Sequence, residues 1–135
     1  VMTLNLHSYV YATQLAVKAM ENGGSIINVA SIGGLGGCPG MSSYGASKAA
    51  VLSFTRSMGA ELAPKGVRVN AICPGTIFSE MMPRDGEFTQ YTLAKIPMGR
   101  GGEPREIGTV AVFFASEDSS YVTGTQLIAD GGMTA

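Results

Sequence analysis

The chain has 135 residues, the size of one ordinary domain, and its 9 Lys plus Arg against 10 Asp plus Glu give a net charge of -1. This balance argues against a nucleic-acid partner and against a polybasic membrane anchor, and no apolar run reaches the length of a transmembrane helix. A hydrophobic share of 45%, a charged share of 14% and 19 Gly favour a buried core, tight turns and a large partner surface. No signal-peptide pattern opens the chain, so we expect a cytoplasmic protein.

Apolar periodicity predicts three helices that alternate with three strands. In the first helix, Leu4, Tyr11, Leu15 and Ala19 are spaced so that they can share one face. Short β-branched runs mark the strands, and Gly or Pro follows most elements. The predicted order is a helix over 3–20, a strand over 25–30, a helix over 42–63 that Ser42 or Ser43 can cap, a strand over 67–72, a helix over 104–116 and a strand over 125–129.

This alternation predicts an α/β fold. It is typical of βαβ units with right-handed crossovers and of a parallel sheet between two layers of helices. The strands are continuous apolar runs, as expected where helices cover both faces of a parallel sheet. Two loops interrupt the pattern: a Gly-rich loop over 31–41, and a long loop over 76–102 that holds Met81, Met82 and Met98.

Cys38 and Cys73 are isolated from each other, and neither has a His nearby. They form no CxxC pair, so the sequence indicates neither a zinc site nor a disulfide framework. We expect two reduced structural thiols and no metal site.

Lys48 is the only charged residue between Asn22 and Thr55. Tyr44 precedes it by one helical turn, so both side chains project from one face of the predicted helix. An ammonium beside a phenol favours the phenolate and brings a tyrosine into range as a general acid or base. Ser31 follows the first strand, where open parallel sheets place their ligands. These three residues form a candidate proton-transfer site, although Tyr-x-x-x-Lys alone more often describes a tyrosine packed on a lysine stem.

Five segments of the chain carry a wider pattern. They are Ser25-Ile-Ile-Asn-Val-Ala-Ser31, Tyr44-Gly-Ala-Ser-Lys48, Gly66-Val-Arg-Val-Asn-Ala-Ile-Cys-Pro-Gly75, Ile96-Pro-Met-Gly-Arg-Gly-Gly-Glu-Pro-Arg-Glu-Ile107, and Val122-Thr-Gly-Thr with Asp130-Gly-Gly132. Together they strongly resemble the short-chain dehydrogenase/reductase family, over essentially the whole chain. The resemblance implies a Rossmann-like fold and an NAD(P)-dependent oxidoreductase that interconverts an alcohol and a carbonyl compound.

The resemblance also implies a role for each matching residue. Tyr44 exchanges the proton at the substrate oxygen, Lys48 stabilises the Tyr44 phenolate and binds the nicotinamide ribose, and Ser31 holds the substrate oxygen. Asn5 matches the family's asparagine that holds a water in a proton relay, although Asn in a helix can also bond locally. The implied cofactor-binding residues are Tyr44, Lys48, Pro74, Gly75, Ile77 and Ser79, the last in place of the family's usual Thr. Residues 78–102 match the mobile substrate loop, whose Met81, Met82 and Met98 could line an apolar pocket or serve ordinary packing.

The family's Gly-rich turn after its first strand, T-G-x-x-x-G-x-G, has no counterpart here. The run Gly33-Gly34-Leu35-Gly36-Gly37 has a different spacing. We therefore expect residues 1–135 to form a single truncated Rossmann-like domain, the C-terminal half of the family's fold. Without the turn that cradles the pyrophosphate, tight binding of NAD or NADP and catalysis by the chain alone are not expected. The sequence does not distinguish NAD from NADP, nor does it identify the alcohol or carbonyl substrate.

A homo-oligomer is expected for two reasons. The strand over 25–30 would have one bare edge, and bare edges favour association. In the family, the helices that match 3–20 and 42–63 pair with their copies. The small residues that would permit close approach of such helices are Gly45, Ala46, Ala49, Ala50 and Ser53.

Two alternative functions fit parts of the sequence. A non-catalytic, self-associating remnant of the fold would keep the site residues by descent. A serine hydrolase is suggested by Gly45-Ala46-Ser47-Lys48-Ala49, which approximates G-x-S-x-G. That pattern fails at its last Gly, and His7, the one His, precedes Ser47, in contrast to the order Ser, Asp, His of that fold. We expect His7 to lie on a helix surface.

Overall fold

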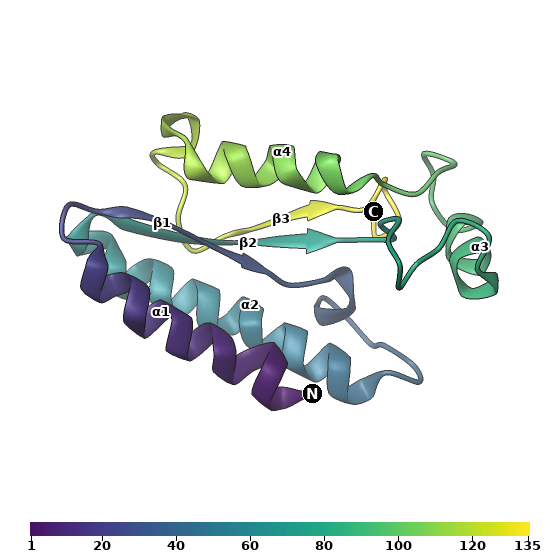
Figure 1. The fold of residues 1–135 in the computed structure, drawn as a ribbon, viewed down its shortest axis with the longest axis horizontal. Coiled ribbons are helices and arrows are strands. Elements are labelled where there is room, and N and C mark those ends of the chain that lie inside the picture. The colour runs from purple at the N-terminus through teal and green to yellow at the C-terminus, as the bar shows by residue number, and fades with distance from the viewer.

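The computed structural model describes all 135 residues and contains a three-stranded parallel sheet with helices on both faces (Figure 1). The strands are β1 (Gly24–Val29), β2 (Val67–Pro74) and β3 (Gln126–Ala129), in the order β1-β2-β3. The helices are α1 (Ser8–Ala19), α2 (Ser42–Leu62), α3 (Glu87–Leu93) and α4 (Pro104–Ala115), and a π-helical turn at Thr3–His7 leads into α1. The predicted α/β class with three parallel strands is confirmed.

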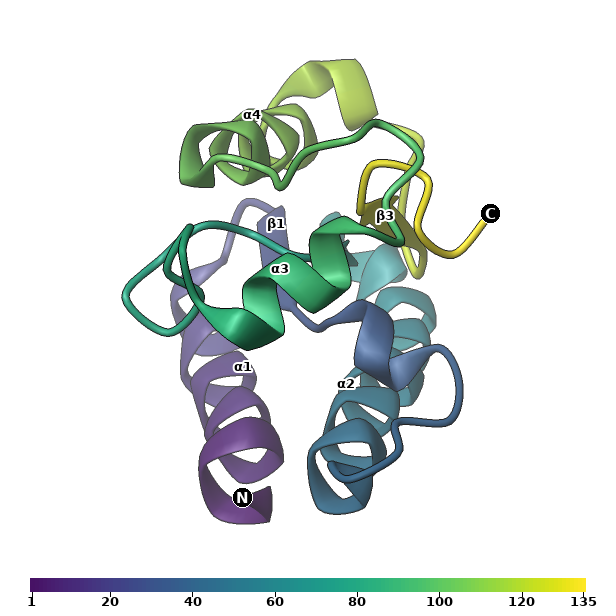
Figure 2. The same cartoon turned by 90° about the vertical axis from the view of Figure 1, so that its right-hand side faces the viewer.

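The sheet is the middle of three layers. Helices α1 and α2 cover one face and α4 covers the other, while α3 lies beyond the carboxyl ends of the strands (Figures 1 and 2). This arrangement confirms the predicted α/β/α layering. It leaves the carboxyl ends of β1 and β2 close to the first turns of α2, which is where the candidate site was expected.

The two crossovers have opposite hands, so the expectation that both are right-handed was wrong. The strands follow one another across the sheet, yet α2 and α4 lie on opposite faces. The β1-α2-β2 crossover is right-handed, and β2-α4-β3 is left-handed (Figure 2). The physical reason is the long segment between Pro74 and Pro104, which passes the carboxyl end of the sheet and includes α3 before α4 begins.

The central strand β2 carries the core. Its side chains at Val67, Val69, Ala71 and Cys73 point toward α1 and α2 and are buried there. Those at Arg68 and Asn70 point toward α4 and the segment after it. Arg68 donates to the Ser119 hydroxyl over 2.9 Å and to the Ser116 carbonyl over 3.1 Å. The central position explains why this strand is the most continuously buried element.

Strand β1 has one free edge. The N–H of Gly24 donates to the Gly66 carbonyl over 3.2 Å, and that of Ala30 donates to the Ile72 carbonyl over 2.8 Å. The N–H and C=O groups of successive residues point to opposite sides of a strand. In β1, the groups of even-numbered residues point toward β2, so those of odd-numbered residues point toward the open edge. Val29 is the last of these within β1.

Helix α1 corrects one expectation about its apolar stripe. Leu4, Tyr11 and Leu15 face solvent, with exposures of 75%, 64% and 67%. The side that packs inward includes Tyr9 and Val17 instead. The helix has apolar residues around most of its circumference, so spacing alone did not decide which side is covered. Ser42 and Ser43 also do not cap α2, which begins at Ser42 without a side-chain cap.

Candidate active site

The candidate site lies at the carboxyl end of β1. Ser31 follows this strand and opens a 3-10 turn at Ile32–Gly34, where its Oγ accepts a hydrogen bond from the Gly33 N–H over 3.1 Å. Tyr44 and Lys48 lie on the first two turns of α2. The chain therefore brings these three predicted residues to one end of the sheet.

Two glycines allow the Ser31 turn to approach α2. A methyl group on Gly33 would lie 3.2 Å from the Tyr44 ring and 3.5 Å from the Ser31 Oγ, so both groups border the same glycine. A methyl group on Gly34 would lie 2.7 Å from the carbonyl carbon of Lys48. The turn thus packs directly on the α2 backbone, and this contact fixes Ser31 relative to Tyr44.

Lys48 is an almost buried cation, with an exposure of 8%. Its Nζ donates to the Val29 carbonyl over 2.9 Å and lies 5.9 Å from the centre of the Tyr44 ring. Burial lowers the pKa of the Lys48 ammonium, while the nearby Cys73 thiol acts to raise it. A charge held here is poorly screened by water, so it acts strongly on a neighbouring oxygen that gains negative charge.

Asn5 makes no hydrogen bond to Lys48. It lies in the π-helical turn at Thr3–His7, and its Nδ2 donates to the Ser47 Oγ over 3.2 Å. The Ser47 hydroxyl in turn donates to the Tyr44 carbonyl over 2.7 Å. π-Helical turns often occur at functional sites. Here the contacts connect Asn5 to the backbone of Tyr44.

Ser47 is fully buried and hydrogen-bonded on both sides. A buried hydroxyl without a neighbouring base has no access to an acyl substrate. His7 is exposed on the π-helical turn and makes no hydrogen bond to Ser47. The hydrolase alternative therefore has no nucleophile and base pair.

The segment after β2 offers backbone groups at the same end of the sheet. The Gly75 N–H donates to the Ala129 carbonyl over 3.0 Å, and Pro74 has no N–H to offer. Ile77 pairs with Gly102 in an isolated parallel bridge, and its own N–H makes no hydrogen bond within the chain. The Ile77 amide is thus a backbone donor of this segment that is available to a ligand. Ser79 is exposed, and its Oγ accepts from the Met82 N–H over 3.2 Å, closing a local turn.

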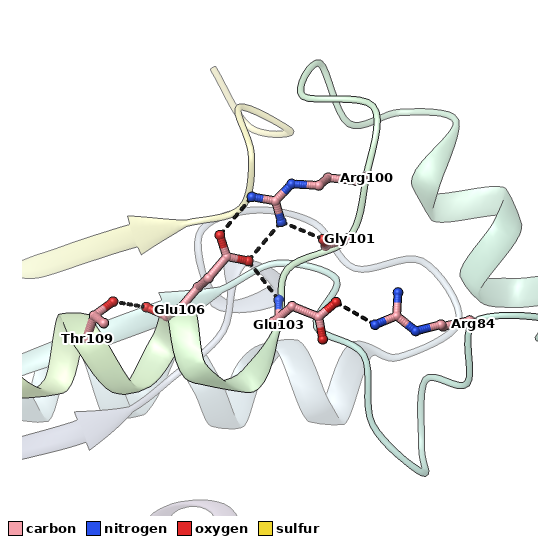
Figure 3. A network of polar contacts seen from close by, with 6 residues as sticks. All are labelled: Arg84, Arg100, Gly101, Glu103, Glu106 and Thr109. Carbon is pink, nitrogen blue, oxygen red and sulfur yellow. Dashed lines mark hydrogen bonds and ion pairs between the residues drawn. The ribbon is translucent and has the colours of Figure 1, made fainter.

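A polar network fixes the long segment beyond β2 to the start of α4 (Figure 3). Arg84 pairs with Glu103, the residue before α4, and its guanidinium also lies 4.0 Å from the centre of the Phe78 ring. Arg100 donates to both carboxylate oxygens of Glu106 over 2.7 and 2.8 Å. The Arg100 hydrogen bonds, together with one from the Glu103 backbone, lower the pKa of Glu106 to about 2.

The methionines of this segment do not form a closed apolar pocket. Met81 and Met98 are exposed by 89% and 64%, and Met82 is half-buried. Phe88 and Tyr91 of α3 are also exposed and lie stacked with their ring centres 6.5 Å apart. This surface faces outward beyond the strand ends.

Sequence reasoning missed two neighbours of Lys48. Tyr9 lies one helical turn after Asn5, and its ring centre is 5.7 Å from the Lys48 Nζ. Cys73 is buried at the end of β2, and burial raises the pKa of its thiol, against the lowering effect of the Ser31 backbone. The i to i+4 spacing from Asn5 to Tyr9 was the available signal.

Both cysteines are free thiols, as expected. No three His, Cys, Asp or Glu side chains gather into a group that could hold a metal ion. None of the helices combines the length and the apolar character needed to cross a bilayer.

The fold and the site together define a Rossmann-type α/β protein with a Ser, Tyr and Lys constellation at the strand ends. Residues 1–134 match the family described as enoyl-(acyl carrier protein) reductase. The chain belongs to the short-chain dehydrogenase/reductase family.

Curated relatives are similar over nearly the whole chain. A 3-oxoacyl-(acyl-carrier-protein) reductase FabG of Thermotoga maritima is 43% identical over 136 residues, which cover 98% of this chain and 55% of that protein. A Xanthobacter autotrophicus protein named inactive 2-(S)-hydroxypropyl-CoM dehydrogenase 2 is 41% identical over 144 residues, covering 100% of this chain and 63% of the relative. The chain thus spans little more than half the length of the curated relatives it matches.

A solved structure has the same arrangement. The crystal structure of a blue fluorescent protein from a metagenomic library, in complex with NADPH, superposes with a TM-score of 0.95 at 37% identity. The match covers 99% of this chain and 55% of that one. A sequence identity of 37% together with the same fold agrees with membership of the two chains in one family.

Proposed function

We propose that the chain carries the proton-transfer part of an NAD(P)-dependent oxidoreductase that interconverts an alcohol and a carbonyl compound. Tyr44 gives a proton to the carbonyl oxygen or takes it from the alcohol, Ser31 hydrogen-bonds that oxygen, and Lys48 stabilises negative charge on the Tyr44 oxygen. The observation that carries the proposal is the convergence of the three groups. The Ser31 Oγ and the Tyr44 ring border Gly33, and the buried Lys48 ammonium lies 5.9 Å from that ring.

Asn5 is proposed as the relay residue that holds a water near this group. Its Nδ2 is engaged by Ser47, which leaves the amide oxygen to accept from a water. The same contact holds the first turn of α2 through the Tyr44 carbonyl. Asn5 would then serve both the geometry of Tyr44 and the transfer of its proton.

The residues at the strand ends fit part of a nicotinamide cofactor. The unpaired Ile77 N–H suits a carboxamide oxygen, and Ile77 follows Pro74 and Gly75 at the carboxyl end of β2. Tyr44 and Lys48 would face the ribose, and the exposed Ser79 would offer its hydroxyl to the cofactor. When bound, the nicotinamide supplies or accepts the hydride, and the chain orients the substrate oxygen and manages the proton.

The test compares Tyr44→Phe with Tyr11→Phe. Tyr11 is an exposed tyrosine on α1, so its variant controls for the loss of a hydroxyl elsewhere. NADPH-dependent reduction of a 3-oxoacyl thioester and of simple ketones is followed by absorbance. Loss of the proton donor should lower any carbonyl reduction by about 10²- to 10⁴-fold, and Tyr11→Phe should not change it. Measurable carbonyl reduction at an equal rate in Tyr44→Phe and the unmodified chain would reject the role of Tyr44.

We also propose that the chain forms a homo-oligomer through α1 and α2 or through the β1 edge. An apolar groove of about 540 Å³ runs between the two helices and is lined mainly by Val10, Val17, Phe54, Met58 and Leu62. The exposed Leu15 extends apolar surface along α1. Light scattering at micromolar concentration tests this proposal, and a monodisperse monomer would contradict it.

A second candidate function is a self-associating protein without catalysis. One observation favours it: a relative that is 41% identical carries the name of an inactive dehydrogenase. Calorimetry with NAD, NADH, NADP and NADPH separates the two functions. A Kd below about 1 mM for any of them supports a working cofactor site, and absence of binding together with self-association supports the second candidate.

A further inference from the structure

Tyr9 shares a hydrogen-bond acceptor with Lys48. The Tyr9 hydroxyl donates to the Val29 carbonyl over 2.8 Å, and the Lys48 Nζ donates to the same oxygen over 2.9 Å. The two donors come from different helices, α1 and α2, and meet at the last residue of β1. A carbonyl oxygen has two lone pairs, so this arrangement satisfies it and holds both donors side by side.

The ring of Tyr9 also lies near the ammonium. The Lys48 Nζ is 5.7 Å from the centre of the Tyr9 ring and 5.9 Å from that of Tyr44. Both distances are within the range in which an aromatic ring attracts a cation. Tyr9 is half-buried and packs against the core cluster that includes Ala30 and Val51. Its ring therefore covers Lys48 on the side of α1.

We propose that Tyr9 is a positioning residue of this site: its ring shields the Lys48 ammonium from water, and its hydroxyl fixes that ring to the Val29 carbonyl. The proposal rests on the proposed function, because the position of Lys48 matters for catalysis only if Tyr44 transfers the proton. Tyr9 would then be the second residue, after Asn5, that the N-terminal helical segment provides to the site, one helical turn further along.

The titratable groups around Lys48 agree with this role. They are Tyr9 from α1, Tyr44 from α2 and Cys73 from β2. Burial raises the pKa of Tyr9, and the neighbouring Tyr44 raises it further, so the Tyr9 hydroxyl stays protonated and remains a donor. Burial is also the main cause that lowers the pKa of Lys48, so removing a covering ring should raise it.

The experiment is competitive labelling of the whole chain with trace acetic anhydride, measured by mass spectrometry from about pH 7 to pH 10.5. It gives the titration midpoint and the limiting rate of Lys48 without requiring a cofactor or turnover. The variants are Tyr9→Phe, which keeps the ring, Tyr9→Leu, which removes it, and Tyr11→Leu, an exposed control on the same helix. The internal references are Lys18, Lys65 and Lys95.

In Tyr9→Leu, the Lys48 midpoint should move upward, and its limiting rate should rise. In Tyr9→Phe, loss of one hydrogen bond should loosen the ring and raise the limiting rate by about two- to tenfold. Tyr11→Leu should change neither. If Tyr9→Leu fails to fold, Tyr9→Phe still decides, because its ring preserves the packing.

An unchanged Lys48 midpoint and rate in a folded Tyr9→Leu chain, or an unchanged rate in Tyr9→Phe, would overturn the proposal. Labelling measures the environment of Lys48 and not the reaction. A negative labelling result therefore rejects the role of Tyr9, whereas an unchanged rate in Tyr44→Phe rejects the proposed function. Matching far-ultraviolet circular dichroism of the variants excludes a general loss of structure as the cause.

Discussion

A methyl group at Gly34 would collide with the backbone of α2. In Gly34→Ala, the new Cβ would lie 2.7 Å from the Lys48 carbonyl carbon and 2.8 Å from the Ala49 nitrogen. Ordinary contact begins near 3.4 Å, so the turn at Ile32–Gly34 must retreat by about 0.7 Å. Overpacking of this kind costs about 1–3 kcal/mol of the free energy of unfolding.

Gly36→Ala is the matched control in the same loop. A methyl group there would have no atom within 4 Å, and neither glycine has a positive φ. Both substitutions reduce the entropy of the unfolded chain alike, so the difference in the free energy of unfolding reports the collision. Urea unfolding and thermal unfolding measure that difference.

We expect the melting temperature of Gly34→Ala to lie about 3–15 °C below that of Gly36→Ala. The turn that retreats carries Ser31, so any carbonyl reduction should fall as well. Equal unfolding curves for the two variants would refute the reasoning, because they would mean that the contact with α2 does not fix the turn.

Three further changes test the packing and the polar network. Phe114→Ala should lower the free energy of unfolding by about 3–5 kcal/mol, because Phe114 is 1% exposed. Urea unfolding measures this cost, and the control variant Phe113→Ala should show a smaller one, because Phe113 is partly exposed. Asn70→Ala should cost about 2–4 kcal/mol by the same assay, since the Val122 carbonyl and the Thr125 N–H lose their partner; a cost near zero would contradict that account. Glu106 has a folded pKa of about 2, below its ordinary 4.5, so its contribution to stability should be present above about pH 4.5 and be lost as the pH falls toward 2. Thermal unfolding across this range should show a shallower decline in Glu106→Gln, and parallel curves would disprove the assignment.

The elements could be predicted where one local force dominated. β1 and β2 are short runs rich in Ile and Val with few polar residues among them, as buried parallel strands favour. Pro104 also marks the start of α4 correctly, because proline suits the first turn of a helix. β2 runs two residues beyond its prediction, to Pro74, since its last backbone groups still pair with β3.

The hand of the second crossover could not be predicted in this way. The preference for right-handed crossovers describes a helix that packs back directly after its strand. Here the segment between Pro74 and Pro104 first binds to itself, through the Ile77 bridge to Gly102 and the Arg84 pair with Glu103. Those contacts join residues far apart in the sequence, and no local sequence pattern predicts them.

The site shows the same division. Tyr44 and Lys48 share a helical face because their spacing is a property of the helix itself. The partners of Asn5 and of Lys48 depend on how α1 lies beside α2, and the sequence contains no signal for the Ser47 or Val29 contacts. The exposed position of Ser79 likewise depends on the turn that its hydroxyl closes with Met82.

The Val29 carbonyl serves the edge of the sheet and the candidate site with a single atom. This carbonyl points to the open edge of β1, where an adjacent strand would donate to it. In the structure, however, it already accepts hydrogen bonds from Tyr9 and Lys48. Any strand that pairs along this edge must compete for that oxygen, and one of the two side chains must yield. Pairing of a further strand with β1 and the position of the Lys48 ammonium are therefore thermodynamically linked. A ligand that draws Lys48 away from the Val29 carbonyl would favour strand pairing, and strand pairing would release Lys48 toward the ligand.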